Sequence, residues 1–464
     1  MLKKLNSSDW GGKQGIYFLL FLLIAILGVY GYFFYFIDGS YLPYYGDEYF
    51  YFKNSENFYL NNSLRAAFTY SGQGSKYLGV DAHGVAYPLI YGLISKLLGW
   101  SNQSILWINL GLLICSLMIL WFCQELTKKR KLLQMLLVLG SPFVFFYSIT
   151  FLPELMHIAG GILLYVLISN QQKAMKNSGL VYVALLILGL GLIRSTWFFA
   201  FFGFQFLKQK PRKVDFLFFG ILGLLLAYVL QQYFHEKVPN VFSDLGESLA
   251  AQKYSTIISD ILFNIKRNIY FAFTYTEGYF YTVLKLWILC TILFSWIYYR
   301  QYRIVKFGLM TLACVMLFNL ILYKNYSWVE LRMYTVFAIF LNLSMVCFAK
   351  KIWSNTLLLS MSLCSFVLIL PFQFKIIHHR IDPEVRTIPP LIIEQIRFEK
   401  EALILLDTLV IKEYALDQLP LQGNSGQPIR YILPYYSQKM EEPLQILVEE
   451  NNQLKVRSTK ILNQ

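Results

Sequence analysis

Runs of about 15 to 25 apolar residues occur throughout the first 372 residues of this 464-residue chain. Such runs are too long for the mixed core of a soluble domain, and about 20 apolar residues are what a helix needs to cross a bilayer. Composition agrees, because 56% of the residues are hydrophobic and only 15% are charged, whereas soluble domains carry about 25% charged residues. The sequence therefore predicts an all-α membrane protein that crosses the bilayer many times.

The apolar runs predict eleven transmembrane helices. The first, 15–37, follows Lys3, Lys4 and Lys13 and has no small-x-small cleavage pattern after it, so we interpret it as a retained anchor and not as a signal peptide. The other expected spans are 104–122, 131–150, 155–170, 179–193, 195–207, 215–233, 282–299, 307–323, 332–349 and 352–372.

The distribution of basic residues predicts the orientation. With the N-terminus in the cytoplasm, the inside connections are rich in Lys and Arg, and the acids in or beside them are Asp9, Glu125 and Asp215. This asymmetry follows the positive-inside rule and explains the net charge of +14 without a nucleic-acid partner. We expect a multi-pass protein of a bacterial inner or plasma membrane, with its N-terminus cytoplasmic and its C-terminus extracytoplasmic.

Two stretches require a choice. Residues 86–99 are apolar but only 14 residues long and contain Lys96, so we expect an interfacial or re-entrant helix there. Residues 179–193 and 195–207 could form one long tilted helix. We predict two helices, because the split keeps the basic residues of 208–213 on the inside.

This topology divides the chain into two domains. Residues 1–372 form the transmembrane domain, with a first external loop at 38–103 and another at 234–281. Residues 373–464 are less apolar and contain Pro and Gly turns, which predicts a small extracytoplasmic α/β domain. The six cysteines lie in or beside apolar runs without a CxxC pair, so we expect small buried side chains and not metal ligands or disulfides.

The first external loop contains the most informative polar residues. Asp47 and Glu48 are adjacent carboxylates about ten residues after the first span. Acids in a loop are most often simply solvated, but near a membrane surface such a pair is also suited to binding a cation or accepting a proton. Later in the same loop, residues 81–91 (Asp-Ala-His-Gly-Val-Ala-Tyr-Pro-Leu-Ile-Tyr) lead into the expected interfacial helix.

This order of motifs resembles the GT-C superfamily of membrane glycosyltransferases, and in particular the branch of protein O-mannosyltransferases and lipid A aminoarabinose transferases. Further along the chain, Pro153-Glu154, Arg194 in Gly-Leu-Ile-Arg-Ser-Thr-Trp and Arg332 in Glu-Leu-Arg-Met-Tyr are similar to other segments of that family. The resemblance covers about residues 1–350. The chain departs from the family at His83, because many relatives have His-Pro-Pro or Lys-Pro-Pro where this chain has His-Gly-Val-Ala-Tyr-Pro.

The resemblance implies roles for these residues. Asp47 and Glu48 would be the catalytic acids, with Asp47 taking the proton of an acceptor hydroxyl. Positive charge for the phosphate of the donor would come from four side chains: Arg194, Arg332, Lys324 and His83. The alternative for the arginines and the lysine is ordinary interfacial anchoring.

A divalent cation (Mg²⁺, Mn²⁺ or Zn²⁺) is the one cofactor that the sequence suggests. Asp47 and Glu154 would be its carboxylate ligands, and His157 lies one helical turn after Glu154. A buried, hydrogen-bonded histidine is the commoner state for a residue such as His157. His378 and His379 have no acid or cysteine at ligand spacing, so we interpret them as surface residues.

We therefore expect an enzyme that transfers a sugar from a polyprenyl-phosphate donor to a glycan, lipid or protein acceptor on the extracytoplasmic face of the membrane. A transporter or flippase of lipid-linked sugars is one alternative, but the chain shows no half-to-half similarity, and its candidate acids are at the outer surface and not in mid-membrane. A polymerase of lipid-linked saccharides is the other alternative.

Overall fold

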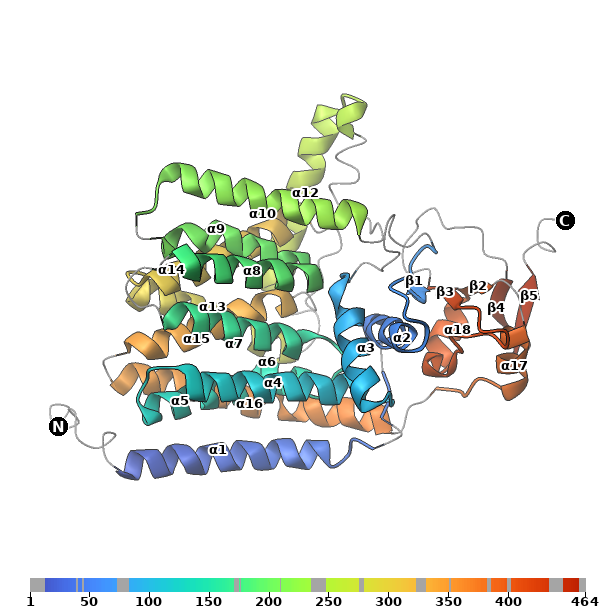
Figure 1. The fold of residues 1–464 in the computed structure, drawn as a ribbon, viewed down its shortest axis with the longest axis horizontal. Helices are drawn as coiled ribbons and strands as arrows, with labels where there is room; N and C mark the ends of the chain where they lie inside the picture. Colours follow the sequence, from blue (N-terminus) through green and yellow to red (C-terminus); the bar gives the residue numbers. More distant parts are fainter. Residues whose placement is uncertain are drawn as a thin grey trace.

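The computed structural model describes residues 13–38, 41–43, 46–72, 83–170, 175, 177–208, 210–234, 248–274, 279–322, 331–349, 352–381, 385–398, 402–433 and 445–458. Most of these residues are helical, and a small sheet lies near the C-terminus. Figure 1 shows a bundle of roughly parallel helices, with the sheet and two crossing helices at one end. We call this end the site end.

Within the described residues, six helices are long and apolar enough to cross a membrane. They are α1 (Lys13–Phe34), α4 (Ser104–Cys123), α10 (Lys213–Tyr233), α13 (Tyr279–Tyr299), α14 (Arg303–Leu322) and α16 (Ile352–Ile381). Large apolar side chains such as Phe21 and Ile24 on α1 and Phe218 and Ile221 on α10 are exposed. Because soluble proteins rarely expose such contiguous apolar surface, the chain is a membrane-spanning helical protein.

The remaining helices of the bundle are shorter. They are α5 (Lys128–Leu139), α6 (Pro142–Tyr147), α7 (Glu154–Ser169), α8 (Asn177–Ile193), η2 (Ser195–Phe199), α9 (Ala200–Phe204), η3 (Gln205–Leu207) and α15 (Arg332–Phe348). The expected span 131–150 is divided between α5 and α6, because the chain turns at Gly140 and Pro142 occupies the first turn of a new helix. Six of the described helices are thus long enough to span a membrane, and the expected total of eleven spans stays a prediction.

Two choices made from the sequence agree with the helix boundaries. The chain breaks between α8 and η2, where Arg194 has an extended backbone. Residues Ala86–Leu98 form α3, which ends at Gly99 with a positive φ of 89°. Helices α3 and α2 (Gly46–Asn61) pack on each other across the site end of the bundle (Figure 1).

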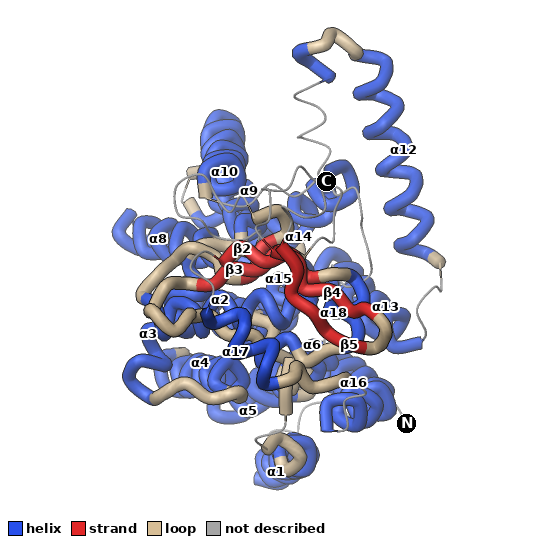
Figure 2. Tube along the Cα trace, turned by 90° about the vertical axis from the view of Figure 1, so that its right-hand side faces the viewer, coloured by secondary structure: helices blue, strands red, loops and turns tan. Residues whose placement is uncertain are grey.

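The described part of the C-terminal region folds into an α/β unit. Its sheet has the order β1-β3-β2-β4-β5, with β1 to β4 parallel and β5 antiparallel to β4. The strands are β1 (Phe68–Thr69), β2 (Ala402–Leu406), β3 (Ile429–Ile432), β4 (Gln445–Glu450) and β5 (Gln453–Ser458), and the helices are α17 (Pro390–Phe398) and α18 (Thr408–Glu413). In Figure 2 the sheet lies across the end of the bundle, in front of helices seen end-on.

The structure changes the expected domain division in two respects. Helix α16 continues to Ile381, beyond the expected boundary at residue 372. In addition, β1 belongs to the first loop and pairs in parallel with β3, so that Phe68 is opposite Tyr431. A single hydrophobic core therefore contains Phe50 and Phe68 of the first loop together with Ile404 and Tyr431 of the C-terminal unit.

Candidate active site

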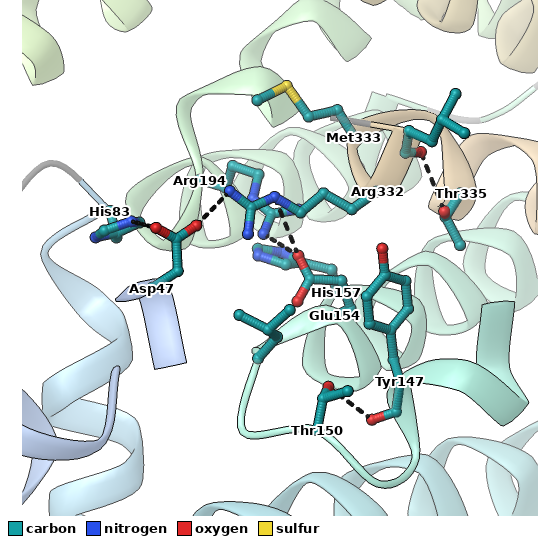
Figure 3. A network of polar contacts seen from close by, with 12 residues as sticks. Asp47, His83, Tyr147, Thr150, Glu154, His157, Arg194, Arg332, Met333 and Thr335 are labelled. Carbon is teal, nitrogen blue, oxygen red and sulfur yellow. Dashed lines mark hydrogen bonds and ion pairs between the residues drawn. The ribbon is translucent and has the colours of Figure 1, made fainter. Parts of the chain in front are cut away.

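Five charged or titratable side chains meet at the site end of the bundle, as Figure 3 shows. They come from five segments that are far apart in the sequence: Asp47, His83, Glu154, Arg194 and Arg332. We call this group the charged cluster. All five were candidate residues in the sequence, and the structure brings them together.

Asp47 lies at one side of the charged cluster and contacts two basic groups. Its Oδ2 accepts a hydrogen bond from Arg332 at 2.7 Å, and its Oδ1 is 3.4 Å from Nε2 of His83. The Asp47 side chain is 26% exposed, whereas Arg332 is only 8% exposed. The carboxylate can therefore be reached from outside, while the guanidinium behind it is nearly enclosed.

Glu154 lies at the other side and contacts both arginines. Arg194 donates to Oε1 of Glu154 at 2.5 Å, and Nε of Arg332 is 3.9 Å from the same oxygen. Glu154 is 1% exposed. Arg332 thus lies between the two carboxylates, and the formal charges of the two acids and two arginines cancel.

Each member of the charged cluster lies at or just before the start of a helix. Asp47 and Glu154 are in the first turns of α2 and α7, and Arg332 is the first residue of α15. His83 and Arg194 come shortly before α3 and η2. A helix start carries a partial positive charge of up to about half an elementary charge and unpaired N–H groups. The starts of α2, α7 and α15 therefore add positive potential, which favours an anion, whereas the end of α8 before Arg194 adds the opposite partial charge.

A close backbone contact sets His83 beside Arg194. Gly84 has a positive φ of 125°, and a β-carbon there would overlap the carbonyl oxygen of Ile193. Next to it, the amide of Val85 donates to the carbonyl of Leu192 at 3.1 Å. The glycine in the His-Gly-Val segment thus allows the loop to dock against the end of α8, one residue before Arg194.

The ionisation of Asp47 is strongly favoured. Burial alone would raise the pKa of its carboxyl group, but Arg332 and His83 outweigh burial and hold that pKa well below its usual range. Tyr51, one turn further along α2, faces the same charges. Its ring is 4.9 Å from that of His83, and burial raises the pKa of its hydroxyl. Tyr51 was not among the residues that the sequence suggested, because it is one of many tyrosines in an aromatic loop.

Glu48 does not share the contacts of Asp47, although the two are adjacent. Glu48 is fully buried, accepts a hydrogen bond from Arg380 at 2.6 Å and accepts another from the backbone amide of Phe151 at 3.0 Å. Arg380 also donates to the carbonyl of Leu42 and lies over the ring of Tyr41. These contacts join the start of α2 to the end of α16. The geometry therefore places Glu48 in a buried ion pair apart from Asp47, and its expected catalytic role stays a prediction.

The other candidate residues lie apart from these contacts or outside the described structure. Lys324 is outside the described residues. His378 is exposed and His379 is partly buried at the end of α16. His157 is buried and accepts a hydrogen bond from the indole of Trp197.

The charged cluster does not fit a metal ion well. Within the described residues, no group of three or more His, Cys, Asp or Glu side chains could hold one. Asp47 and Glu154, the two expected ligands, are both in contact with the guanidinium of Arg332. A cationic side chain therefore occupies the position between the carboxylates that a shared metal ion would need.

The sequence did not suggest Arg380 as the partner of Glu48, or Trp197 as the partner of His157. Arg380 follows the last apolar run, and a basic residue there is usually an interfacial anchor. Trp197 lies three residues after Arg194, in an aromatic stretch. The sequence around each of these residues does not identify its distant contact partner.

No known family model, curated protein or solved structure matches this chain.

Proposed function

We propose that this protein is a membrane glycosyltransferase that moves a sugar from a polyprenyl-phosphate donor to an acceptor hydroxyl on the extracytoplasmic face. The observation that carries the proposal is the charged cluster: an accessible carboxylate, Asp47, beside two largely buried arginines, where several helices begin at the end of a membrane bundle. A lipid-linked donor would have its tail in the bilayer and its phosphate at this level.

Arg332 and Arg194 suit the phosphate of such a donor. Guanidinium groups bind phosphate oxygens through two parallel N–H bonds and retain their charge at any physiological pH. The helix starts around them add positive potential. The negative charge that builds up on the leaving phosphate would thereby be stabilised where it forms.

Asp47 is the base in this proposal. The acceptor oxygen forms a bond to the anomeric carbon while the bond from that carbon to the phosphate oxygen breaks. The proton of the acceptor hydroxyl passes to Asp47, and polyprenyl phosphate leaves with the bonding electrons. Asp47 is more exposed than Glu154, so an acceptor from outside reaches it more readily.

The pair of Asp47 and Arg332 would couple donor binding to activation of the base. A carboxylate whose pKa is far below the working pH is a weak proton acceptor. When the donor phosphate engages Arg332, the attraction between Arg332 and Asp47 weakens. The pKa of Asp47 then rises, because only His83 still offsets its burial. Asp47 would then be a stronger base only when the donor is bound.

The test is transfer of labelled sugar from polyprenyl-phosphate monosaccharides by the purified protein in detergent. We expect the wild type to transfer sugar and Asp47→Asn to be slower by about a hundredfold to ten-thousandfold, the usual contribution of a general base. The matched control is Asp260→Asn, which removes an acid from α12 (Tyr254–Phe273) away from the charged cluster. It should retain wild-type activity.

Both variants must be folded and inserted for the comparison to count, which their thermal melting and elution as a single species would establish. Full activity of folded Asp47→Asn would remove Asp47 as the base. No transfer by folded wild type with any donor would instead favour movement of a lipid-linked sugar across the membrane.

A further inference from the structure

Two buried side-chain atoms of α7, one of them on Glu154 of the charged cluster, have no hydrogen-bond partner among the described residues. His157 is buried one helical turn after Glu154, and its Nδ1 accepts a hydrogen bond from the indole N–H of Trp197 at 3.0 Å. Because an indole can only donate, Nδ1 carries no proton, and the neutral ring holds its proton on Nε2. That Nε2–H is buried and has no hydrogen-bond partner among the described residues.

Glu154 presents the complementary group. Its Oε1 accepts from Arg194, whereas its Oε2 is buried and has no hydrogen-bond partner in the described part of the chain. Residues three apart on a helix lie on the same face, and Figure 3 shows His157 and Glu154 close together under the guanidinium groups. One face of α7 thus carries both a donor and an acceptor that have no partner among the described residues.

We propose that Glu154 and His157 bind a hydroxyl group of the donor sugar. A hydroxyl can donate to Oε2 of Glu154 and accept from Nε2–H of His157 at the same time. A phosphate oxygen cannot satisfy both, because it would be repelled by the carboxylate. This inference rests on the proposed function and divides the work of the site. The two arginines bind the phosphate, Asp47 takes the proton, and the α7 pair recognises the sugar ring.

The experiment combines variants of His157 with altered donors. The donors are a polyprenyl-phosphate monosaccharide that the wild type uses and its analogues, each lacking one ring hydroxyl. We expect His157→Phe to lower kcat/KM for the complete donor by about tenfold to a hundredfold. One of the analogues should show a similar loss with wild type and no further loss with His157→Phe, because the lost contact is the same.

Three further measurements separate recognition from packing. Binding of sugar-free polyprenyl phosphate should be equal in wild type and His157→Phe. His157→Gln, whose amide can donate from a similar position, should recover part of the activity. His378→Phe makes the same substitution at an exposed histidine of α16 and should change nothing.

Failure of this inference differs from failure of the proposed function. If wild type transfers sugar and His157→Phe is impaired by the same factor with every donor, His157 is a packing residue and the sugar subsite is wrong. A structure with bound donor in which only a water molecule contacts Nε2 would also overturn it. If wild type transfers no sugar at all, the proposed function fails, and the subsite fails with it.

A second, independent observation concerns α12. Its Asn264 and Asn268 side chains donate to the carbonyls of Ile321 and Leu320 at 2.8 and 2.9 Å, and so satisfy backbone oxygens in the last turn of α14. Figures 1 and 2 both show α12 running across the direction of the bundle helices and projecting outward from them. It is therefore fixed at the end of a membrane-length helix, roughly parallel to the expected membrane surface.

The exposed side chains of α12 fit a lipid surface. One face, at helical spacing, carries five largely exposed apolar residues: Tyr254, Ile258, Leu262, Ile269 and Phe273. Lys253 and Arg267 lie on other faces, and Lys266 lies at the edge of the apolar face, beyond which Phe263 and Tyr270 are also exposed. We infer that α12 lies in the interface of the leaflet at the site end, with its apolar face in the acyl chains and its basic residues at anionic headgroups.

Photocrosslinking in vesicles of phosphatidylethanolamine and phosphatidylglycerol tests this position. A diazirine side chain in place of Ile258 should crosslink to lipid, whereas the same group in place of Asp260, on another face of the helix, should give little lipid product. Equal lipid labelling at both positions, or crosslinks from position 258 to a second protein chain, would overturn the inference.

Discussion

At the scale of single residues, Asp47 and Glu48 show how environment divides two adjacent carboxylates. Asp47 is partly exposed and pairs with Arg332 and His83, whereas Glu48 is enclosed with Arg380. The α2 helix turns successive side chains by about 100°, so neighbours in sequence point to different surroundings. Substitutions at the two positions should therefore affect different properties of the protein.

The low pKa of Asp47 predicts a specific pH dependence. Because folding lowers this pKa, the ion pairs of Asp47 stabilise the protein above the unfolded pKa of about 4, and this stabilisation is lost only as the pH falls toward the folded value. In the wild type, Asp47 should stay ionised in the free enzyme, so kcat/KM should show no loss from its protonation down to a pH of about 5.

Arg332→Gln should change this profile. Without the cation, burial of Asp47 is opposed only by His83, so the pKa of Asp47 should rise and kcat/KM should begin to fall at a higher pH than in wild type. The shape of the pH–rate profile is the readout, since the loss of phosphate binding lowers all points. An unchanged acidic limb in a measurably active Arg332→Gln would contradict the coupling between these residues.

Glu48→Gln should destabilise the protein by about 3–5 kcal/mol, because it leaves the guanidinium of Arg380 buried without its charge partner. The double variant Glu48→Gln/Arg380→Gln should lose less than the sum of the two single variants, because it leaves no uncompensated buried charge. Denaturation of all three variants in detergent measures this. Additive losses would show that the pair is not coupled.

At the scale of elements, helix starts and one close contact arrange the charged cluster. Helices α2, α7 and α15 begin at it, and the loop before α3 docks on the end of α8 through Gly84. Regular helices fix these starts relative to one another. The loop of His83, in contrast, depends on a single residue without a side chain.

Gly84→Ala should therefore impair activity more than stability. An added methyl group would overlap the Ile193 carbonyl and push His83 away from Asp47, which should lower kcat/KM by about tenfold or more. Gly99→Ala is the matched control, because Gly99 also has a positive φ but has no neighbouring atoms where the methyl group would lie. Equal effects of the two substitutions on kcat/KM would mean that backbone strain, and not the contact with α8, is responsible.

At the scale of the whole molecule, the sequence predicts what depends on local pattern and misses what depends on distant partners. Apolar runs indicated the helices, and basic residues suggested the break at Arg194 that the structure has. The pairing of Phe68 with Tyr431 and of Glu48 with Arg380 joins residues more than 300 positions apart. No local pattern contains that information, so the shared sheet and the structural position of Glu48 could not be predicted.

The shared core predicts that damage to the C-terminal unit will reach the charged cluster. Ile404 of β2 is fully buried in the core that also contains Phe50, one turn after Asp47 on α2. Ile404→Asp would place a charge there, at a cost of roughly 3 kcal/mol or more.

If the core acts as one unit, Ile404→Asp should lower sugar transfer along with the stability of the C-terminal unit. Leu409→Asp, at an exposed position of α18, should affect neither. Limited proteolysis and transfer assays on the same preparations measure the two effects together. A protein whose C-terminal unit is digested in Ile404→Asp while transfer continues at the wild-type rate would show that the first loop folds without its partner strands. In that case α2 and its packing against α3 would be sufficient to hold Asp47 in place.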